Sequence, residues 1–204
     1  MKINRGLFCS LAILSLVTSS CVSTTLTSEW KDETYLFWPE KKIFIVGAFS
    51  GEVVRKMFEE EFVRQLTAQG TEAVASCTVL AFDVVPKQEV VLSLIKEQRA
   101  DAVIITRYLG KTSTAPVPPA GISCDPPQLS DIWQDYYTQG YSVMPAYTQE
   151  RDVYRLETAL YDAGTEKLVW KTVSETTVEK EIMPEYKLII ALMIKKLQIE
   201  KLIQ

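Results

Sequence analysis

Short apolar runs and amphipathic stretches alternate along the middle of the chain. The run 42–49 (KIFIVGAF) is apolar and rich in β-branched residues, which is typical of a strand buried on both faces. Over 52–69, apolar residues return every three or four positions, and this period predicts an amphipathic helix. The same criteria predict a second strand, a second helix and a third strand at 72–82, 86–99 and 101–109.

The predicted helix at 52–69 has two chemically different sides. Its apolar positions are Val54, Met57, Phe58, Phe62 and Leu66. The charged positions opposite them are Arg55, Lys56, Glu59, Glu60 and Arg64. We therefore expect the acidic triplet Glu59-Glu60-Glu61 to lie mostly in solvent, and Gly70 to end the helix.

A hairpin and a helix follow a long irregular stretch. Residues 110–150 contain six prolines and show little periodicity, so we expect a long excursion that starts where Gly110 ends the third strand. The β-rich runs 151–161 and 167–179 flank a turn with glycine, which predicts a hairpin. Pro184 then opens a helix to about 203, and its polar side is traced by Lys187, Ala191, Lys195 and Gln198.

This order of elements predicts a single layered α/β (α+β) domain over 41–204. The order is β-α-β-α-β, the Pro/Tyr-rich excursion at 110–150, and then β-β-α, which suits helices packed on a mixed sheet. Residues 21–40 are predicted to form a tether, because the stretch 22–32 (VSTTLTSEWKD) is Ser/Thr-rich and shows no clear helical or strand period.

The first twenty residues have the pattern of a lipoprotein signal peptide. Lys2 and Arg5 precede an apolar stretch at 7–17 that is too short to cross about 30 Å of hydrocarbon comfortably. Small residues then lead to Cys21, which predicts cleavage after residue 20 and lipidation of Cys21. Val22 lacks the acidic character of an inner-membrane retention signal, so the resemblance to sorted lipoproteins implies an outer-membrane anchor facing the periplasm.

Composition excludes several classes of function. The chain has no histidine and a net charge of −4, which becomes −6 when Lys2 and Arg5 leave with the leader. Histidine-dependent catalysis and Cys/His zinc sites are therefore excluded, and nucleic acid is a poor partner for an acidic chain. The loop GAFSG at 47–51 lacks the Gly-Lys-Ser/Thr of a phosphate loop. We predict no metal, no cofactor and no catalytic residue.

Two cysteines remain after processing. Cys77 and Cys124 favour one disulfide bridge in an oxidising compartment. The alternative is that Cys77 is a buried thiol and Cys124 lies in a loop beyond its reach.

The aromatic residues of the excursion are the candidate interaction surface. Large rings with a polar edge serve well as anchors at interfaces. The alternative is that these rings fold back over the sheet or form part of a further strand. The five residues are Trp133, Tyr136, Tyr137, Tyr141 and Tyr147.

The second half resembles a family of bacterial outer-membrane lipoproteins of unknown function. The resemblance rests on Tyr136-Tyr137, on Gly140-Tyr141, on LETALYDAGTEKLVW at 156–170 and on SETT at 174–177. The wider layout is similar to the amino-terminal domain of TolB and to envelope lipoproteins of that shape. This likeness is architectural, so it implies a binding or assembly role and no particular partner.

The sequence therefore predicts a lipid-anchored, non-enzymatic binding or envelope-assembly protein that contacts a protein partner or itself. Two alternatives stay open. Paired acids such as Asp131 and Asp135, with the aromatic residues, would suit a glycan- or cell-wall-directed enzyme or small-ligand binder. A subunit of an oligomeric secretion channel is the other alternative.

Overall fold

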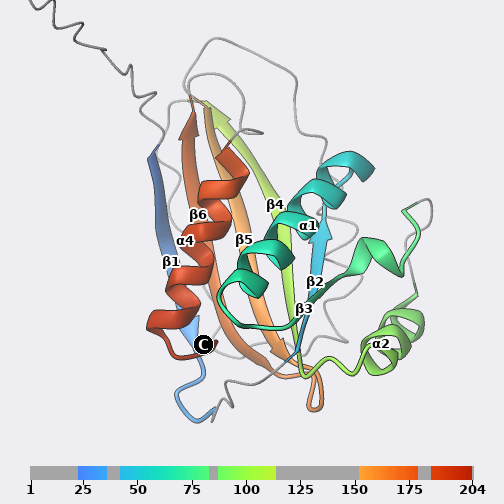
Figure 1. Cartoon of the computed structure of the whole chain (residues 1–204). Coiled ribbons are helices and arrows are strands. Elements are labelled where there is room, and N and C mark those ends of the chain that lie inside the picture. Colours follow the sequence, from blue (N-terminus) through green and yellow to red (C-terminus); the bar gives the residue numbers. More distant parts are fainter. Residues whose placement is uncertain (1–22, 36–41, 83–86, 114–151, 179–184, 204) are drawn as a thin grey trace, which may run out of the picture.

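The described residues form a six-stranded mixed sheet with helices on both faces (Figure 1). The computed structural model describes residues 23–35, 42–82, 87–113, 152–178 and 185–203. Across the sheet the strands follow the order β1-β6-β5-β4-β2-β3. The predicted α/β class with helices packed on a mixed sheet is confirmed.

Parallel strands form one half of the sheet. Strand β2 (Ile43–Ala48) lies between β3 (Ala73–Ala75) and β4 (Ala102–Ser113), and pairs with both in parallel. Helix α1 (Glu52–Ala68) connects β2 to β3, and helix α2 (Gln88–Glu97) lies between β3 and β4. Every residue of β2 is buried, as the uninterrupted apolar run predicts for a strand covered on both faces.

Antiparallel strands form the other half. Strands β5 (Asp152–Asp162) and β6 (Leu168–Val178) make the predicted hairpin, and β5 pairs antiparallel with β4. Strand β1 (Ser23–Lys31) closes this edge by pairing antiparallel with β6. Helix α4 (Tyr186–Ile199) follows, with Lys187, Ala191 and Lys195 exposed as predicted.

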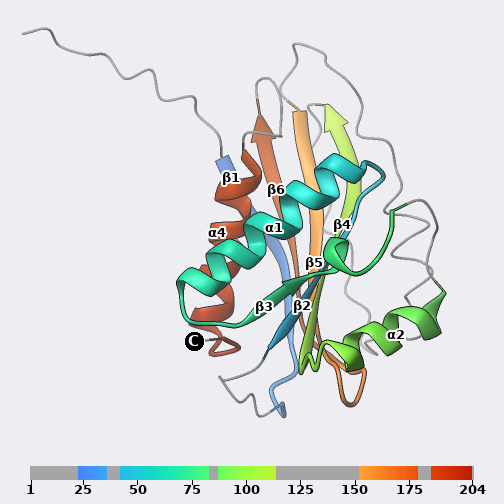
Figure 2. The ribbon, with the colours of Figure 1, turned by 45° about the vertical axis from the view of Figure 1, so that its right-hand side comes forward.

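The two faces of the sheet carry separate apolar cores. Helices α1 and α4 cover one face through residues that include Phe58, Phe62, Leu66, Ile190 and Met193. Helix α2 covers part of the other face, where the core includes Phe44, Val46, Val91, Ile95 and Val103. Because α1 and α2 lie on opposite faces, the chain changes sides of the sheet after β3 (Figures 1 and 2).

Two element boundaries differ from the prediction. The strand predicted over 72–82 ends after Ala75, where the 3-10 helix η1 (Ser76–Thr78) begins. Strand β4 passes through Gly110 and continues to Ser113, with a bulge between Tyr108 and Gly110. Gly110 adopts a φ of 125°, so glycine here permits a bulge within the strand and does not end it.

The tether prediction is wrong for Ser23–Lys31, which forms β1. Exposed and half-buried residues alternate along this strand, which is the period of a sheet edge with one side against the protein. Threonine and serine occupy two of the four alternating half-buried positions, 24 and 28, and Leu26 and Trp30 occupy the other two. The sequence pattern is therefore weak, although Thr24 and Thr176 still pair by a hydroxyl hydrogen bond of 3.0 Å.

The predicted sides of α1 also need correction. Phe58, Phe62 and Leu66 are buried as expected, but Met57 is 38% exposed. Arg55, Glu59 and Glu61 are buried, against the prediction that charged positions face solvent. Arg55 and Glu59 are buried because that flank of α1 packs against η1 and the end of β2, where polar groups need partners in the interior. Glu61 is buried elsewhere, beneath Arg64 and Gln65, which both donate to it.

Candidate functional site

A buried ion pair lies at the amino end of α1. The Arg55 Nε donates to Glu59 Oε1 at 3.0 Å, and the two side chains are 3% and 0% exposed. The Arg55 Nη2 also donates to Ser76 Oγ at 2.9 Å and to the carbonyl oxygen of Leu80 at 3.2 Å. The pair is therefore stabilised by hydrogen bonds to groups outside its own helix, as a buried charge requires.

The Glu59 carboxylate joins three segments of the chain. Its Oε1 accepts hydrogen bonds from the Gly47 backbone N–H at 2.8 Å and from the Ser76 hydroxyl at 2.7 Å. Its Oε2 accepts from the Cys77 backbone N–H at 2.6 Å. Because Gly47 lies in β2 and Ser76 begins η1, this carboxylate holds the carboxyl ends of two parallel strands against α1.

Near this point the chain passes from one face of the sheet to the other. The helix after β2 covers one face and the helix after β3 covers the other. In open α/β sheets, small ligands bind beyond the carboxyl ends of the strands. The position therefore makes this end of the sheet the first place to look for a ligand site.

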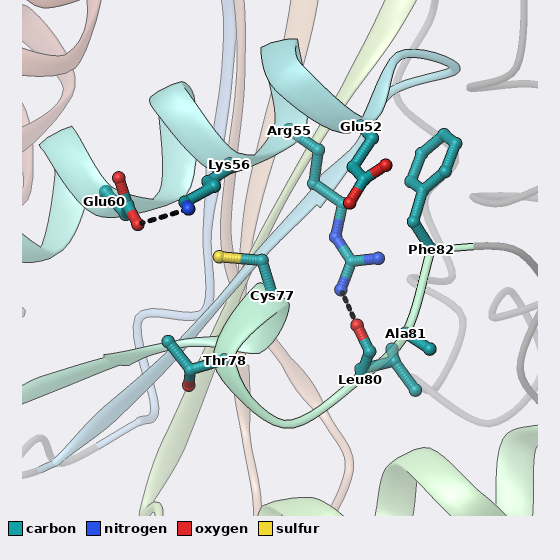
Figure 3. Close-up of a pocket in the computed structure, with 9 residues that line it drawn as sticks. All are labelled: Glu52, Arg55, Lys56, Glu60, Cys77, Thr78, Leu80, Ala81 and Phe82. Atoms are coloured by element: carbon teal, nitrogen blue, oxygen red, sulfur yellow. Dashed lines mark hydrogen bonds and ion pairs between the residues drawn. The ribbon is translucent and has the colours of Figure 1, made fainter.

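A pocket of about 260 Å³ opens at the same position (Figure 3). Its charged lining comes from α1 and consists of Glu52, Arg55, Lys56 and Glu60. Its other wall is formed by Cys77, Thr78, Leu80, Ala81 and Phe82. Acidic and basic groups are equal in number, so the pocket has no net preference for an anion.

The geometry of the pocket does not match hydrolysis of a glycosidic bond. Glu52 and Glu60 are eight residues apart on one helix, which corresponds to about 12 Å along the axis. Paired carboxylates in glycosidases lie within about 10 Å of each other. The Glu60 carboxylate also faces Lys56 Nζ at 3.8 Å. The Glu60 carboxylate is thus engaged with Lys56 and not with Glu52.

The loop at 47–51 does not form a phosphate cradle. Its Gly47 N–H already donates to the Glu59 carboxylate, and the Phe49 N–H bonds to the Gly47 carbonyl at 3.0 Å. A phosphate placed here would meet the negative charge of Glu59. The loop instead starts α1 at Gly51, in line with the absence of a phosphate-loop motif.

Cys77 lies in the wall of the pocket and is half-buried. Burial, together with the neighbouring negative charge of Glu59, raises the pKa of the Cys77 thiol to about 12. A thiol with this pKa is almost wholly protonated near neutral pH and is a poor nucleophile. Cys124 lies outside the described residues, so the disulfide stays a prediction.

A second polar cluster lies where the 114–151 segment leaves and rejoins the sheet. Lys111 Nζ pairs with Asp152 Oδ2 at 2.7 Å, and the Tyr108 and Tyr154 rings lie 6.3 Å apart. Burial, and then the neighbouring Tyr154 and Asp152, raise the pKa of Tyr108 to about 12. The described residues offer no hydrogen-bond partner to Tyr108 Oη or Asp152 Oδ1, which are both buried.

The edge formed by β1 is the third feature. Strand β1 pairs with β6 on one side, and no described strand pairs with its other side. Its carboxyl end is fixed to α4, because Lys196 Nζ lies 2.8 Å from Glu29 Oε2 and Lys31 Nζ lies 3.3 Å from Glu200 Oε2. The strand is thus firmly placed at the border of the sheet (Figure 1).

The remaining predicted site residues lie outside the described part of the chain. They are Cys21, Cys124, Trp133, Tyr136, Tyr137, Tyr141 and Tyr147. Within the described ranges, no helix is long and apolar enough to cross a bilayer. Nor does any group of three or more potential metal ligands come together in those ranges.

Comparisons with known proteins give likeness at the level of structure alone. No protein-family model and no curated protein matches the chain. A PelC dodecamer from Paraburkholderia phytofirmans is similar, with 13% identity, a TM-score of 0.44 and coverage of 83% of this chain and 92% of that one. A point variant of that protein has 12% identity and a TM-score of 0.42, and the match covers 81% of this chain and 89% of that one. At these TM-scores the likeness carries no conclusion about what this chain does.

Proposed function

We propose that this protein is a lipid-anchored, non-enzymatic lipoprotein of the bacterial envelope that works by binding, as an accessory or assembly protein. The sequence supports this localisation through the leader at 1–20 and the cysteine that follows it. An outer-membrane anchor facing the periplasm is part of the proposal. Its proposed partner is either another protein or further copies of the same chain.

The observation that carries the proposal is the position of β1. The strand begins at Ser23, two residues after Cys21, and two residues span at most about 7 Å. Lipidation of Cys21 would therefore hold the amino end of β1 close to the membrane surface. A domain attached at the end of an edge strand is held near the membrane without a long tether, which suits assembly there.

The pocket supports binding more than catalysis. Its two outer acids lie eight residues apart on α1, Glu60 faces Lys56, and the raised pKa of the Cys77 thiol keeps it protonated near neutral pH. The charge pair beneath it is engaged by hydrogen bonds to the backbone and to Ser76. The enzyme alternative therefore gains no support from this part of the chain.

The address is tested by expressing the full chain in a bacterium and measuring the intact mass of the mature protein from detergent extracts. We expect a polypeptide that begins at Cys21 and carries the mass of its acyl groups. Cys21→Ala should lack this mass and leave the membrane fraction. Cys77→Ala is the matched control and should remain acylated and membrane-bound.

The binding role is tested on the same cells. A membrane-permeant amine crosslinker should join the anchored protein to a discrete protein species in intact envelopes, and Cys21→Ala should lose this product. A mature protein that begins at another residue would contradict the proposed localisation. Anchored protein that yields no crosslinked species at any expression level would contradict the binding role.

A further inference from the structure

We propose that two copies of this chain join through their β1 strands, in an antiparallel register centred on Thr25, so that the two sheets become continuous. The inference rests on the proposed function only in placing both copies on one membrane. It adds the surface, the partner and the register. The occupant of the β1 edge is thus a second copy of the same strand.

Strand β1 has the properties of an edge that accepts another strand. It is nine residues long, whereas β3 at the opposite edge has three. Its first part, Ser23–Leu26 in the sequence STTL, carries no charge and no proline, and these are the usual protections of an exposed edge. Ser23, Thr25 and Thr27 are exposed. The bulge at Thr27, between Leu26 and Ser28, is the one such protection in this segment.

Charge decides the direction of pairing. A parallel, in-register pair would place Glu29 beside Glu29 and Lys31 beside Lys31, and like charges on neighbouring strands are destabilising. An antiparallel pair centred on Thr25 places Ser23 opposite Thr27 and Thr25 opposite itself. Hydroxyl pairs of this kind are favourable between strands. The strand is therefore self-complementary in the antiparallel register.

Symmetry and the anchor favour a second copy over another partner. A twofold axis through Thr25 uses the same surface on both chains, which is the commonest form of self-association. Each copy anchored at Cys21 carries the amino end of β1 two residues from the lipid, so an antiparallel pair with both anchors in one membrane would lie with its strands along the membrane surface. A strand from an unrelated protein has neither advantage.

The register is tested with a cysteine at the proposed axis. The mature chain from residue 21 is prepared with Cys21→Ala, Cys77→Ser and Cys124→Ser, and Thr25→Cys is added. Facing residues have Cβ atoms about 5 Å apart, so a short bismaleimide should join two copies. Glu72→Cys, whose native side chain is 71% exposed next to β3, is the matched control and should give little dimer.

A charge exchange tests the same register without crosslinking. Ser23→Lys with Thr27→Lys places lysine opposite lysine between copies, whereas Ser23→Lys with Thr27→Glu places lysine opposite glutamate. The second variant should associate roughly tenfold more tightly in sedimentation equilibrium. Circular dichroism should show both variants equally folded, because positions 23 and 27 are exposed.

The outcomes separate this inference from the proposed function. Equal association of the two charge variants, or equal crosslinking of Thr25→Cys and Glu72→Cys, would overturn pairing through β1. Neither result depends on the lipid, because Cys21 is replaced throughout. Failure of acylation at Cys21 in the bacterium would overturn the address and leave the β1 pairing to stand on these measurements.

Discussion

The carboxylate of Glu59 accepts four hydrogen bonds, and each comes from a different residue. The donors are Gly47, Arg55, Ser76 and Cys77. Removing one member of such a buried pair leaves the other charge without compensation, which costs much more than the net contribution of an intact pair. Glu59 is therefore a stability determinant for the end of the sheet where the pocket lies.

Glu59→Gln should lower the free energy of unfolding by about 3–5 kcal/mol, because the neutral amide leaves Arg55 unpaired and turns an N–H₂ group toward donors. Urea denaturation of the soluble Cys21→Ala protein measures the loss. Glu60→Gln is the matched control, since the Glu60 side chain is 53% exposed, and it should change stability by less than about 0.5 kcal/mol. Equal effects of the two substitutions would contradict a buried role for Glu59.

Glu61 makes stability depend on pH. The hydrogen bond from Arg64 is the largest cause that lowers the pKa of Glu61, from 4.5 to about 2. The unfolded chain then binds more protons between these values, so the contribution is complete above pH 4.5 and is lost as pH falls toward 2. In urea melts over this range, Glu61→Gln should show a smaller decrease in stability than the wild type. A parallel decrease in both proteins would remove Glu61 as the cause.

The candidate site shows where residue-level prediction fails. An opposite-charge pair at the i, i+4 spacing, such as Arg55 and Glu59, is usually a solvent-exposed pair on a helix. Its burial depends on η1, which the sequence pattern merges into a longer strand. Ser76 is the one local signal, because a serine within an apolar run requires a hydrogen-bond partner. The aromatic candidates at 133–147 lie outside the described residues and stay predictions.

At the scale of elements, periodicity predicts those whose apolar residues are dense. The buried strand β2, the helix α1 and the β5–β6 hairpin match their predicted ranges closely. The pattern does not predict the edge strand β1, because threonine and serine occupy half of its alternating half-buried positions. Pairing with β6 is a long-range contact that no local pattern contains.

The bulge in β4 gives a prediction for one glycine. Gly110→Ala should lower the free energy of unfolding by about 1–2 kcal/mol, because its φ of 125° is unfavourable for a residue with a Cβ. An added Cβ would meet no atom within 4 Å, so the cost comes from the backbone alone. Gly164→Ala, where the backbone has no such φ, should be nearly neutral in the same urea melts. A neutral Gly110→Ala would show that the bulge tolerates other residues.

For the whole molecule, the anchor and the β1 edge both promote association between copies of the chain. Confinement to a membrane raises the effective concentration of one copy for another. Only Val22 lies between Cys21 and Ser23, so the amino end of β1 stays within about 7 Å of the anchored residue. Weak pairing in solution should therefore become substantial once both copies are anchored.

Reconstituted vesicles test this expectation. With Cys77 and Cys124 replaced by serine, acylated Thr25→Cys protein should form more bismaleimide dimer on vesicles than the Cys21→Ala form does at the same bulk concentration. Adding protein-free lipid and fusing the vesicles dilutes anchored copies, so the dimer fraction should fall as the area per protein rises. Acylated Glu72→Cys should show little dimer at every lipid ratio, because its edge is not the one that pairs. A dimer fraction that does not change as lipid is added would mean that the anchor does not promote pairing through β1.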